Sequence, residues 1–89
     1  MEYRLVVFNE KQWLKDLSAL PRQVAGRILD KLEKLEHLPW SKDVHAKKLQ
    51  HYDLADFRMR IGDYRVLFNL DKEGKQVVLL RVLHRSQCY

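Results

Sequence analysis

The chain has 89 residues, enough for one domain with one hydrophobic core and too few for two. Hydrophobic residues make up 46% of it and aromatic residues 10%, a composition that argues against a disordered chain. Lys and Arg number 17 against 12 Asp and Glu, so the net charge is +5 and the pI is near 9.5. This balance favours a polyanionic partner such as RNA, DNA or an acidic protein segment.

The single cysteine, Cys88, excludes an internal disulfide framework and a cysteine-based zinc site. The opening residues 1–4 do not begin a signal peptide, and the apolar run after them is too short for one. No stretch approaches the roughly 20 apolar residues that a membrane-spanning helix needs. We therefore expect a cytoplasmic protein without a membrane partner.

The first half of the chain predicts a strand followed by two helices. Residues 3–8 are rich in β-branched and aromatic residues and include the apolar run Leu5-Val6-Val7-Phe8, which indicates a strand. Asn9 is a favourable N-cap, and Gln12 completes a capping-box pattern. Apolar residues then recur at helical spacing, first at Trp13, Leu14, Leu17 and Leu20, and after Pro21 at Val24, Ile28, Leu32 and Leu35. The second helix should stop near Leu38, before Pro39. The charged residues expected on exposed helix faces are Glu10, Lys15, Asp16, Arg27, Lys31 and Lys34.

The second half predicts three strands. Residues 40–56 are polar and without periodicity, which indicates a connecting loop with Leu49 as an anchor. Strands follow over 57–61 and 64–70, and Gly62-Asp63 between them suits a type II′ hairpin turn. A longer turn over 71–75 leads to a last strand over 77–83. The order β-α-α-β-β-β predicts an α+β fold over residues 1–89, a small antiparallel-rich sheet with an N-terminal helical hairpin on one face.

The two-residue turn fixes which side chains of the hairpin share a face. Arg60 should lie opposite Arg65, and Arg58 opposite Leu67. One face is then apolar and covers the helices, with Phe57, Met59, Ile61, Tyr64, Val66 and Phe68. The other face carries Arg58, Arg60 and Arg65. Pairing of Leu70 with Gln76 would place Arg81 opposite Arg65, with Arg85 on the same face further along.

Like charges directly opposite destabilise a sheet by a few tenths to about 1 kcal/mol, so an arginine face needs a reason. A solvated face, partly compensated by acids in the turns, is the plain alternative. Arginine offers a planar fork of donors that matches phosphate, and it stays charged throughout a reaction. We therefore predict a phosphate-binding surface. The His and Asp residues over 37–56 fit no compact ligand pattern, so no metal is expected.

The hairpin Phe57-Arg-Met-Arg-Ile-Gly-Asp-Tyr-Arg, the later run ending in His84-Arg85, and Tyr89 resemble the RelE/ParE superfamily of toxin–antitoxin toxins. The resemblance extends over the whole length and includes Lys47-Lys48-Leu49. It implies a RelE-like fold and the toxin of a type II toxin–antitoxin system. One branch of the superfamily comprises ribosome-dependent mRNA endonucleases, and another comprises poisons of DNA gyrase. The His84-Arg85 and Tyr89 end is more similar to the nuclease branch.

The nuclease branch implies cleavage of mRNA in the ribosomal A site without a metal or other cofactor. The ribose 2′-OH attacks the phosphodiester, which requires a base, positive charge around the phosphorane and an acid for the leaving oxygen. We predict catalytic roles for Arg60, Arg65, His84 and Arg85. We predict RNA contacts for Lys47, Lys48, Arg58, Arg81 and Tyr89. His84 has a suitable intrinsic pKa for the base, but strand parity places it on the core side, with Leu80 and Val82.

The expected partners are a cognate antitoxin protein and mRNA with the ribosome. The complex with the antitoxin is expected to be a heterotetramer. The antitoxin should bring carboxylates to the arginine face or an apolar helix to a groove. Two alternatives remain open at this point. The first is a ParE-like inhibitor of DNA gyrase with the same fold, and the second is a non-catalytic nucleic-acid-binding relic.

Overall fold

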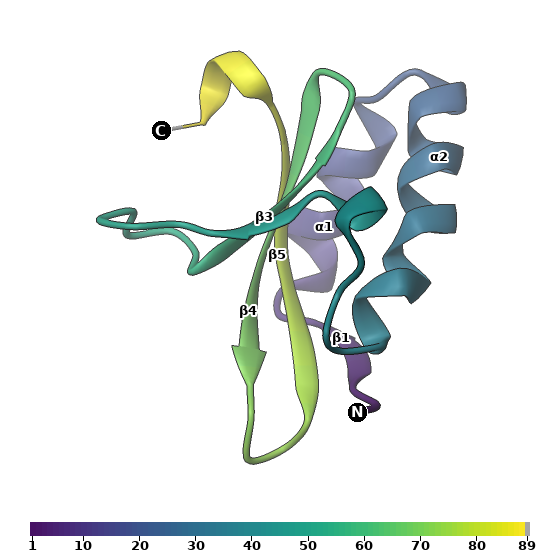
Figure 1. Ribbon diagram of the computed structural model, residues 1–89. Helices are drawn as coiled ribbons and strands as arrows, with labels where there is room; N and C mark the ends of the chain where they lie inside the picture. Colours follow the sequence, from purple (N-terminus) through teal and green to yellow (C-terminus); the bar gives the residue numbers. More distant parts are fainter. Residues whose placement is uncertain (89) are drawn as a thin grey trace.

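The computed structural model describes residues 1–88 as a five-stranded sheet with two helices. The strands are β1 (Arg4–Val7), β2 (Ala46–Lys48), β3 (Phe57–Ile61), β4 (Tyr64–Asp71) and β5 (Gln76–His84). The helices are α1 (Glu10–Ser18) and α2 (Arg22–Leu32), with short 3₁₀ turns η1 (Glu33–Glu36), η2 (Lys42–Val44) and η3 (Arg85–Gln87). Figure 1 shows α1 and α2 side by side on one face of the sheet. The predicted α+β fold with a helical hairpin on one face is confirmed.

The strands lie in the order β1-β5-β4-β3-β2. β1 runs parallel to β5, and the other neighbours are antiparallel. The prediction that residues 40–56 form only a loop is wrong, because β2 adds an edge strand to β3. β2 is three residues long and contains two lysines, too short and too polar for an alternating pattern to reveal it.

Asn9 begins α1 as predicted: its side-chain oxygen accepts a hydrogen bond from the Gln12 main-chain N–H at 3.1 Å. The other half of the predicted capping box is absent. The Gln12 side chain instead donates to Oδ1 of Asp16 at 3.0 Å. α2 ends at Leu32 and continues as η1 to Glu36, so helical geometry stops shortly before the predicted Leu38.

The hairpin between β3 and β4 has the predicted register, with Arg60 opposite Arg65 and Arg58 opposite Leu67. Gly62 has a φ of +57°, a left-handed conformation that glycine adopts without a steric penalty and that a type II′ turn requires at its first central position. The register prediction is confirmed because a two-residue turn permits only one pairing of the two strands.

The predicted register between β4 and β5 is wrong. Leu70 pairs with Val77 instead of Gln76, and Arg65 lies opposite Leu83 instead of Arg81. The pairs Phe68–Leu79 and Leu67–Arg81 leave Leu80 without a partner, which is a β-bulge in β5. A bulge cannot be predicted from the sequence of a strand alone, because packing on both faces of the sheet determines where the extra residue lies.

The main core lies between the helices and the sheet. Its fully buried side chains include Ile28 and Leu35 from the helical side and Met59, Val66 and Phe68 from the strands. The aromatic rings of Trp40, Phe57 and Phe68 contact one another at its edge. The predicted apolar hairpin face is therefore the face that covers the helices.

A second, smaller apolar cluster lies on the opposite face of the sheet. It comprises Ala55, Leu67 and Leu83, with Leu49, Tyr52, Leu80 and Cys88 packed against them. The loop over residues 49–56 folds onto this face, and the Leu49 N–H donates to the Asp56 carbonyl at 2.7 Å to close it. Figure 1 shows this loop projecting away from the helices. Leu49 is the anchor predicted for it. Among residues 1–88, no helix is long and apolar enough to cross a membrane.

Candidate nucleic-acid interface

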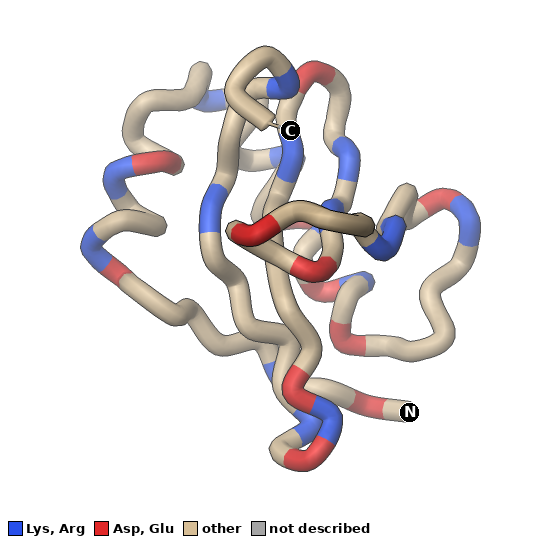
Figure 2. The backbone as a smooth tube through the Cα atoms, turned by 90° about the vertical axis from the view of Figure 1, so that its left-hand side faces the viewer, with Lys and Arg blue, Asp and Glu red and all other residues tan. Residues whose placement is uncertain are grey.

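Four basic side chains gather on the sheet face that points away from the helices. Lys47 lies opposite Arg58 across β2 and β3, and Arg60 lies opposite Arg65 across β3 and β4. We call these four residues the cationic face. Figure 2 looks at the molecule from this side and shows Lys and Arg on neighbouring strands, while several acidic residues lie in connecting loops and turns. Neighbouring cations repel one another, so this face favours an anionic ligand.

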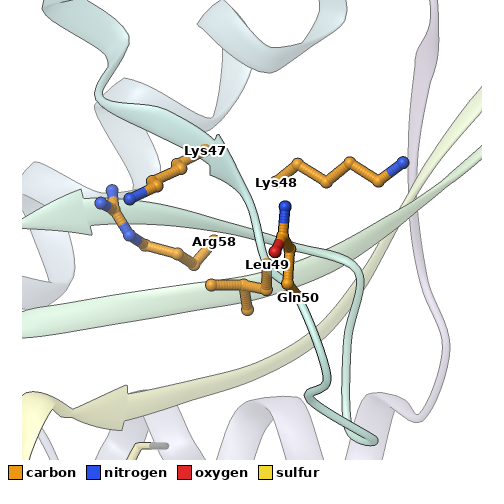
Figure 3. Close-up of a pocket in the computed structure, with 5 residues that line it drawn as sticks. All are labelled: Lys47, Lys48, Leu49, Gln50 and Arg58. Atoms are coloured by element: carbon orange, nitrogen blue, oxygen red, sulfur yellow. The ribbon is translucent and has the colours of Figure 1, made fainter.

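Lys47 and Arg58 border an open hollow of about 420 Å³, which Lys48, Leu49 and Gln50 complete. Figure 3 shows the nitrogen-bearing ends of Lys47 and Arg58 close together, whereas Lys48 points the other way. This divergence follows from strand alternation, because Lys48 is paired with the core-facing Phe57. Of the two lysines predicted to contact RNA, only Lys47 therefore belongs to the cationic face.

Two arginines of the cationic face are held by main-chain carbonyl oxygens. Nη1 of Arg58 donates to the His45 carbonyl at 2.7 Å. Nη1 of Arg65 donates to the carbonyls of Gly62 and Tyr64, each at 3.0 Å. A carbonyl orients a guanidinium without cancelling its charge. The Arg60 side chain is exposed and has no hydrogen-bond or ion-pair partner among the described residues.

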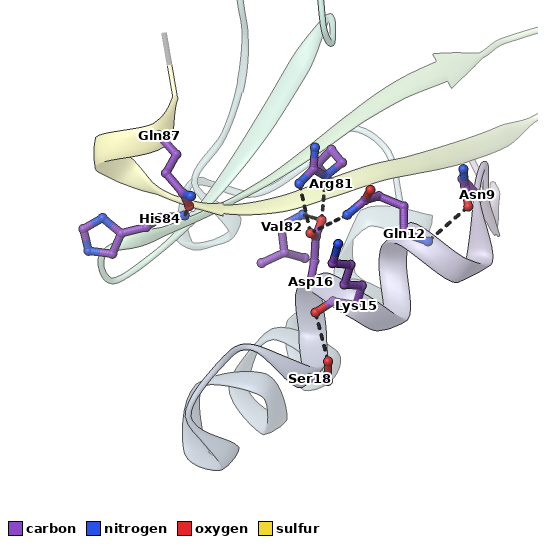
Figure 4. Close-up of polar contacts among 9 residues, drawn as sticks. All are labelled: Asn9, Gln12, Lys15, Asp16, Ser18, Arg81, Val82, His84 and Gln87. Carbon is purple, nitrogen blue, oxygen red and sulfur yellow. Dashed lines mark hydrogen bonds and ion pairs between the residues drawn. The ribbon is translucent and has the colours of Figure 1, made fainter.

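Arg81 is engaged differently, because a carboxylate neutralises it. Nε and Nη2 of Arg81 donate to the two oxygens of Asp16 at 2.8 and 3.0 Å, and the Val82 N–H donates to the same carboxylate at 3.0 Å. Figure 4 shows this contact between α1 and β5. The ion pair lies just past Leu79, the last β5 residue that is paired with β1, where the main-chain groups at the edge of β5 would otherwise have no partner strand. Arg81 is thus bound to a helix and is not part of the cationic face.

Burial acts to raise the pKa of Asp16, but hydrogen bonds from Arg81, Val82 and Gln12 outweigh it and lower that pKa. The same carboxylate raises the pKa of Arg81. Asp16 was predicted on an exposed helix face, and that prediction is wrong, since it is 8% exposed. Its position three residues after the buried Trp13, on the apolar side of α1, is the signal that could have found it.

His84 lies on the helix side of the sheet, opposite Tyr64, with the two rings perpendicular and 5.3 Å apart. Strand parity predicted this side. Its Nδ1 contacts the Ser86 hydroxyl at 2.8 Å and accepts from the Ser86 N–H at 3.1 Å, which caps η3. Leu80, predicted beside it, packs in the second cluster because of the bulge. The sheet therefore separates His84 from the cationic face.

Arg85 is exposed, and its Nε lies 3.6 Å from an oxygen of Asp63 in the β3–β4 turn. The Arg85 N–H also donates to the Asp63 carbonyl at 2.7 Å, so η3 is attached to the end of the hairpin. Cys88 packs in the second cluster, where burial raises its pKa. Tyr89, predicted to contact RNA, lies outside the described residues. Within those residues, no group of three or more His, Cys, Asp or Glu side chains could hold a metal ion.

Comparisons with known proteins agree with one another. The family model for the ParE toxin of type II toxin–antitoxin systems, parDE, matches residues 7–89. A chain of the RelE–RelB complex from Pyrococcus horikoshii is 30% identical with a TM-score of 0.75, and the match covers 99% of this chain and 100% of that one. A chain of the toxin–antitoxin complex RelBE2 from Mycobacterium tuberculosis is 29% identical with a TM-score of 0.75, over 96% and 100% of the two chains. A chain of the RelB–RelE complex from Methanococcus jannaschii is 25% identical with a TM-score of 0.68, over 93% and 91%. No curated protein sequence matches.

Proposed function

We propose that this chain, which belongs to the ParE toxin family of type II toxin–antitoxin systems within the RelE/ParE superfamily, arrests translation by cutting mRNA. The proposed reaction takes place in the ribosomal A site and needs no metal. The 2′-OH of a ribose attacks the adjacent phosphorus, the bond to the 5′ oxygen of the next nucleotide breaks, and a 2′,3′-cyclic phosphate and a 5′-OH remain. Negative charge builds up on the phosphorane oxygens during this attack.

The observation that carries the proposal is the cationic face, whose arginines are oriented but not neutralised. The guanidiniums of Arg58 and Arg65 are bonded to carbonyl oxygens, and the guanidinium of Arg60 lies beside them with no partner among residues 1–88. Fixed, uncompensated guanidiniums stabilise developing charge without having to reorganise. We assign Arg60 and Arg65 to the scissile phosphate, and Lys47 with Arg58 to a neighbouring phosphate in the hollow.

The residues at the end of β5 take different parts in this proposal. Arg85 is exposed, and its contact with the Asp63 carboxylate is long, at 3.6 Å. Its side chain can therefore separate from Asp63 and approach the oxygen of the leaving group. His84 acts through η3, which it caps, and thereby supports Arg85. Arg81 is left out because Asp16 already occupies its donors. Tyr89 remains a predicted stacking partner for an unpaired base.

The proposed partner that silences the toxin is a cognate antitoxin. The similar chains from Pyrococcus horikoshii and Methanococcus jannaschii come from complexes named as RelE with RelB. An acidic segment of such a partner would neutralise the cationic face, and a heterotetramer is the assembly that we expect.

A gyrase inhibitor with the same fold is the second candidate, because the matching family model describes ParE toxins. Such a protein would use the same charges to approach DNA without cleaving RNA. The two candidates share the antitoxin and the fold but differ in the nucleic acid that they damage.

Pulsed expression separates these candidates. Primer extension on a translated message should reveal cuts at fixed codon positions, and a gyrase supercoiling assay should show no accumulated DNA breaks. Replacing Arg60 and Arg65 with alanine should reduce cleavage by about 10²- to 10³-fold, the usual loss when transition-state donors are removed. The matched control removes two positive charges from an exposed part of α1, Lys11→Ala with Lys15→Ala, and should cleave normally. DNA breaks without RNA cuts would replace the proposal by the gyrase function, and neither activity would indicate a binding relic.

A further inference from the structure

His45 adopts a backbone conformation that is unusual for a residue with a side chain. It lies between η2 and β2 with a φ of +58° and a ψ of 35°, in the left-handed region. Only a few per cent of residues other than glycine enter this region, because the Cβ atom crowds the backbone, and asparagine, aspartate and histidine do so more often than the rest. Its side chain is exposed, and the contacts that this position makes with β3 come from its backbone.

The left-handed turn directs the His45 carbonyl at β3, where the oxygen accepts two hydrogen bonds. One comes from Nη1 of Arg58 at 2.7 Å, and the other from the main-chain N–H of Arg60 at 3.2 Å. A single oxygen thus fixes the guanidinium of one cationic-face residue and the backbone of the next. Strained non-glycine conformations cluster at functional sites, where their surroundings maintain them.

We propose that His45 is a positioning residue for RNA binding: its left-handed conformation presents the carbonyl that holds the Arg58 guanidinium beside Lys47. The ligand is the phosphate backbone of single-stranded RNA, so the inference rests on the proposed function and deepens it. Because the Arg58 guanidinium is already held before RNA binds, binding does not incur the entropic cost of immobilising this long side chain.

The chain contains a matched control for this idea. His51 has an exposed side chain and a φ of +57°, almost the same as that of His45. It lies in the loop over residues 49–56 and is not bonded to an arginine of the cationic face. A β-branched residue at either position meets the same steric conflict with the left-handed region. Only at His45 should that conflict release an arginine.

The first measurement uses the unaltered protein. In its NMR spectrum, rotation about the Nε–Cζ bond should be slower for Arg58 than for the unpartnered Arg60. This readout does not depend on any activity, so it distinguishes a failure of the positioning role from a failure of the proposed function. Equal rotation rates in the two side chains would overturn the proposal.

The second measurement is the affinity for a fluorescent 2′-O-methyl oligoribonucleotide, which cannot be cleaved. His45→Val should weaken binding about two- to tenfold, the equivalent of immobilising one long side chain. The slope of log K against log salt should stay at its original value, because every Lys and Arg of the cationic face is still present. Arg58→Ala should instead make that slope shallower by about 0.7, the amount for one phosphate contact with a single strand.

Two further variants complete the test. His45→Gly, which enters the left-handed region freely, should restore most of the affinity lost in His45→Val. His51→Val should leave the affinity as it is. Equal losses from His45→Val and His51→Val, or no loss from His45→Val in a protein that binds the oligonucleotide, would refute the positioning role. If the wild-type protein does not bind the free oligonucleotide, the Arg58 rotation rate alone decides the positioning role, and primer extension on a translated message decides the proposed function.

Discussion

The carboxylate of Asp16 joins α1 to β5, and replacing it with alanine should destabilise the fold substantially. Asp16 is 8% exposed and accepts hydrogen bonds from Arg81, Val82 and Gln12. Loss of the acceptor for the buried Val82 N–H alone should cost about 1–3 kcal/mol. The Arg81 side chain is 36% exposed and can return to water, so its share is discounted to about 1 kcal/mol.

We therefore expect Asp16→Ala to lower the free energy of unfolding by about 3 kcal/mol, which corresponds to a fall in Tm of about 12–24 °C in a domain of this size. The measurement is urea unfolding at pH 7, followed by the fluorescence of Trp13, which lies on the same helix, and Trp40. Lys15→Ala, one residue away and exposed, is the control and should change stability by less than about 0.5 kcal/mol. A loss below about 1 kcal/mol for Asp16→Ala would refute the idea that this carboxylate secures the open edge of β5.

The same contact predicts a pH dependence with a definite sign. The pKa of Asp16 is lowered in the fold, because the hydrogen bonds from Arg81, Val82 and Gln12 outweigh the opposing effect of burial. Its contribution to stability is therefore complete above the ordinary value of 3.8 and is lost as the pH falls through the lowered pKa. The stability difference between the wild type and Asp16→Asn should be largest near pH 7 and should shrink at pH 3. A constant difference between pH 7 and pH 3 would contradict this assignment.

Two other positions allow simple tests. Gly62→Ala gives a side chain to a residue in the left-handed region, and its Cβ would lie 3.3 Å from the end of the Arg27 side chain, which can move aside. Backbone strain should therefore lower the free energy of unfolding, measured in urea, by about 1–2 kcal/mol. An unchanged free energy of unfolding would rule out the positive φ. The hydrogen bond from the Ser41 hydroxyl, together with the hydrogen bond and charge of Lys34, lowers the pKa of Asp43 to about 2. An NMR titration of this carboxyl should therefore find its midpoint below that of Asp43 in a Ser41→Ala variant.

The parts of the fold that depend on neighbouring residues were predictable from the sequence. The hairpin register follows from a two-residue turn, and the start of α1 follows from the Asn9 cap. The bulge at Leu80 was not predictable, because it results from packing against Leu67 and Leu83 on the second face. β2 was also missed, since it becomes a strand only by pairing with β3.

The candidate site shows the same division. Alternation along the strands predicted that Arg58, Arg60 and Arg65 share a face, and the confirmed hairpin register puts them there. It could not predict which acceptor each arginine meets. The partner of Arg81, Asp16, lies 65 positions away in the sequence. Only the assembled fold reveals that a carboxylate accepts the hydrogen bonds of Arg81, whereas a main-chain carbonyl accepts that of Arg58. The difference between a neutralised and an oriented arginine is therefore a property of tertiary structure.

The place of β5 between β1 and β4 also determines when this toxin can fold during its own synthesis. A ribosome makes β1 early and β5 after all the other strands, yet β5 is the partner that β1 and β4 share. Until β5 has left the exit tunnel, β1 has no strand to pair with and Asp16 has neither Arg81 nor Val82 to bind. Pairings between distant segments form late and slowly. A nascent chain interrupted before β5 therefore lacks a completed sheet, and a cell that stalls on this message releases fragments without a folded toxin domain.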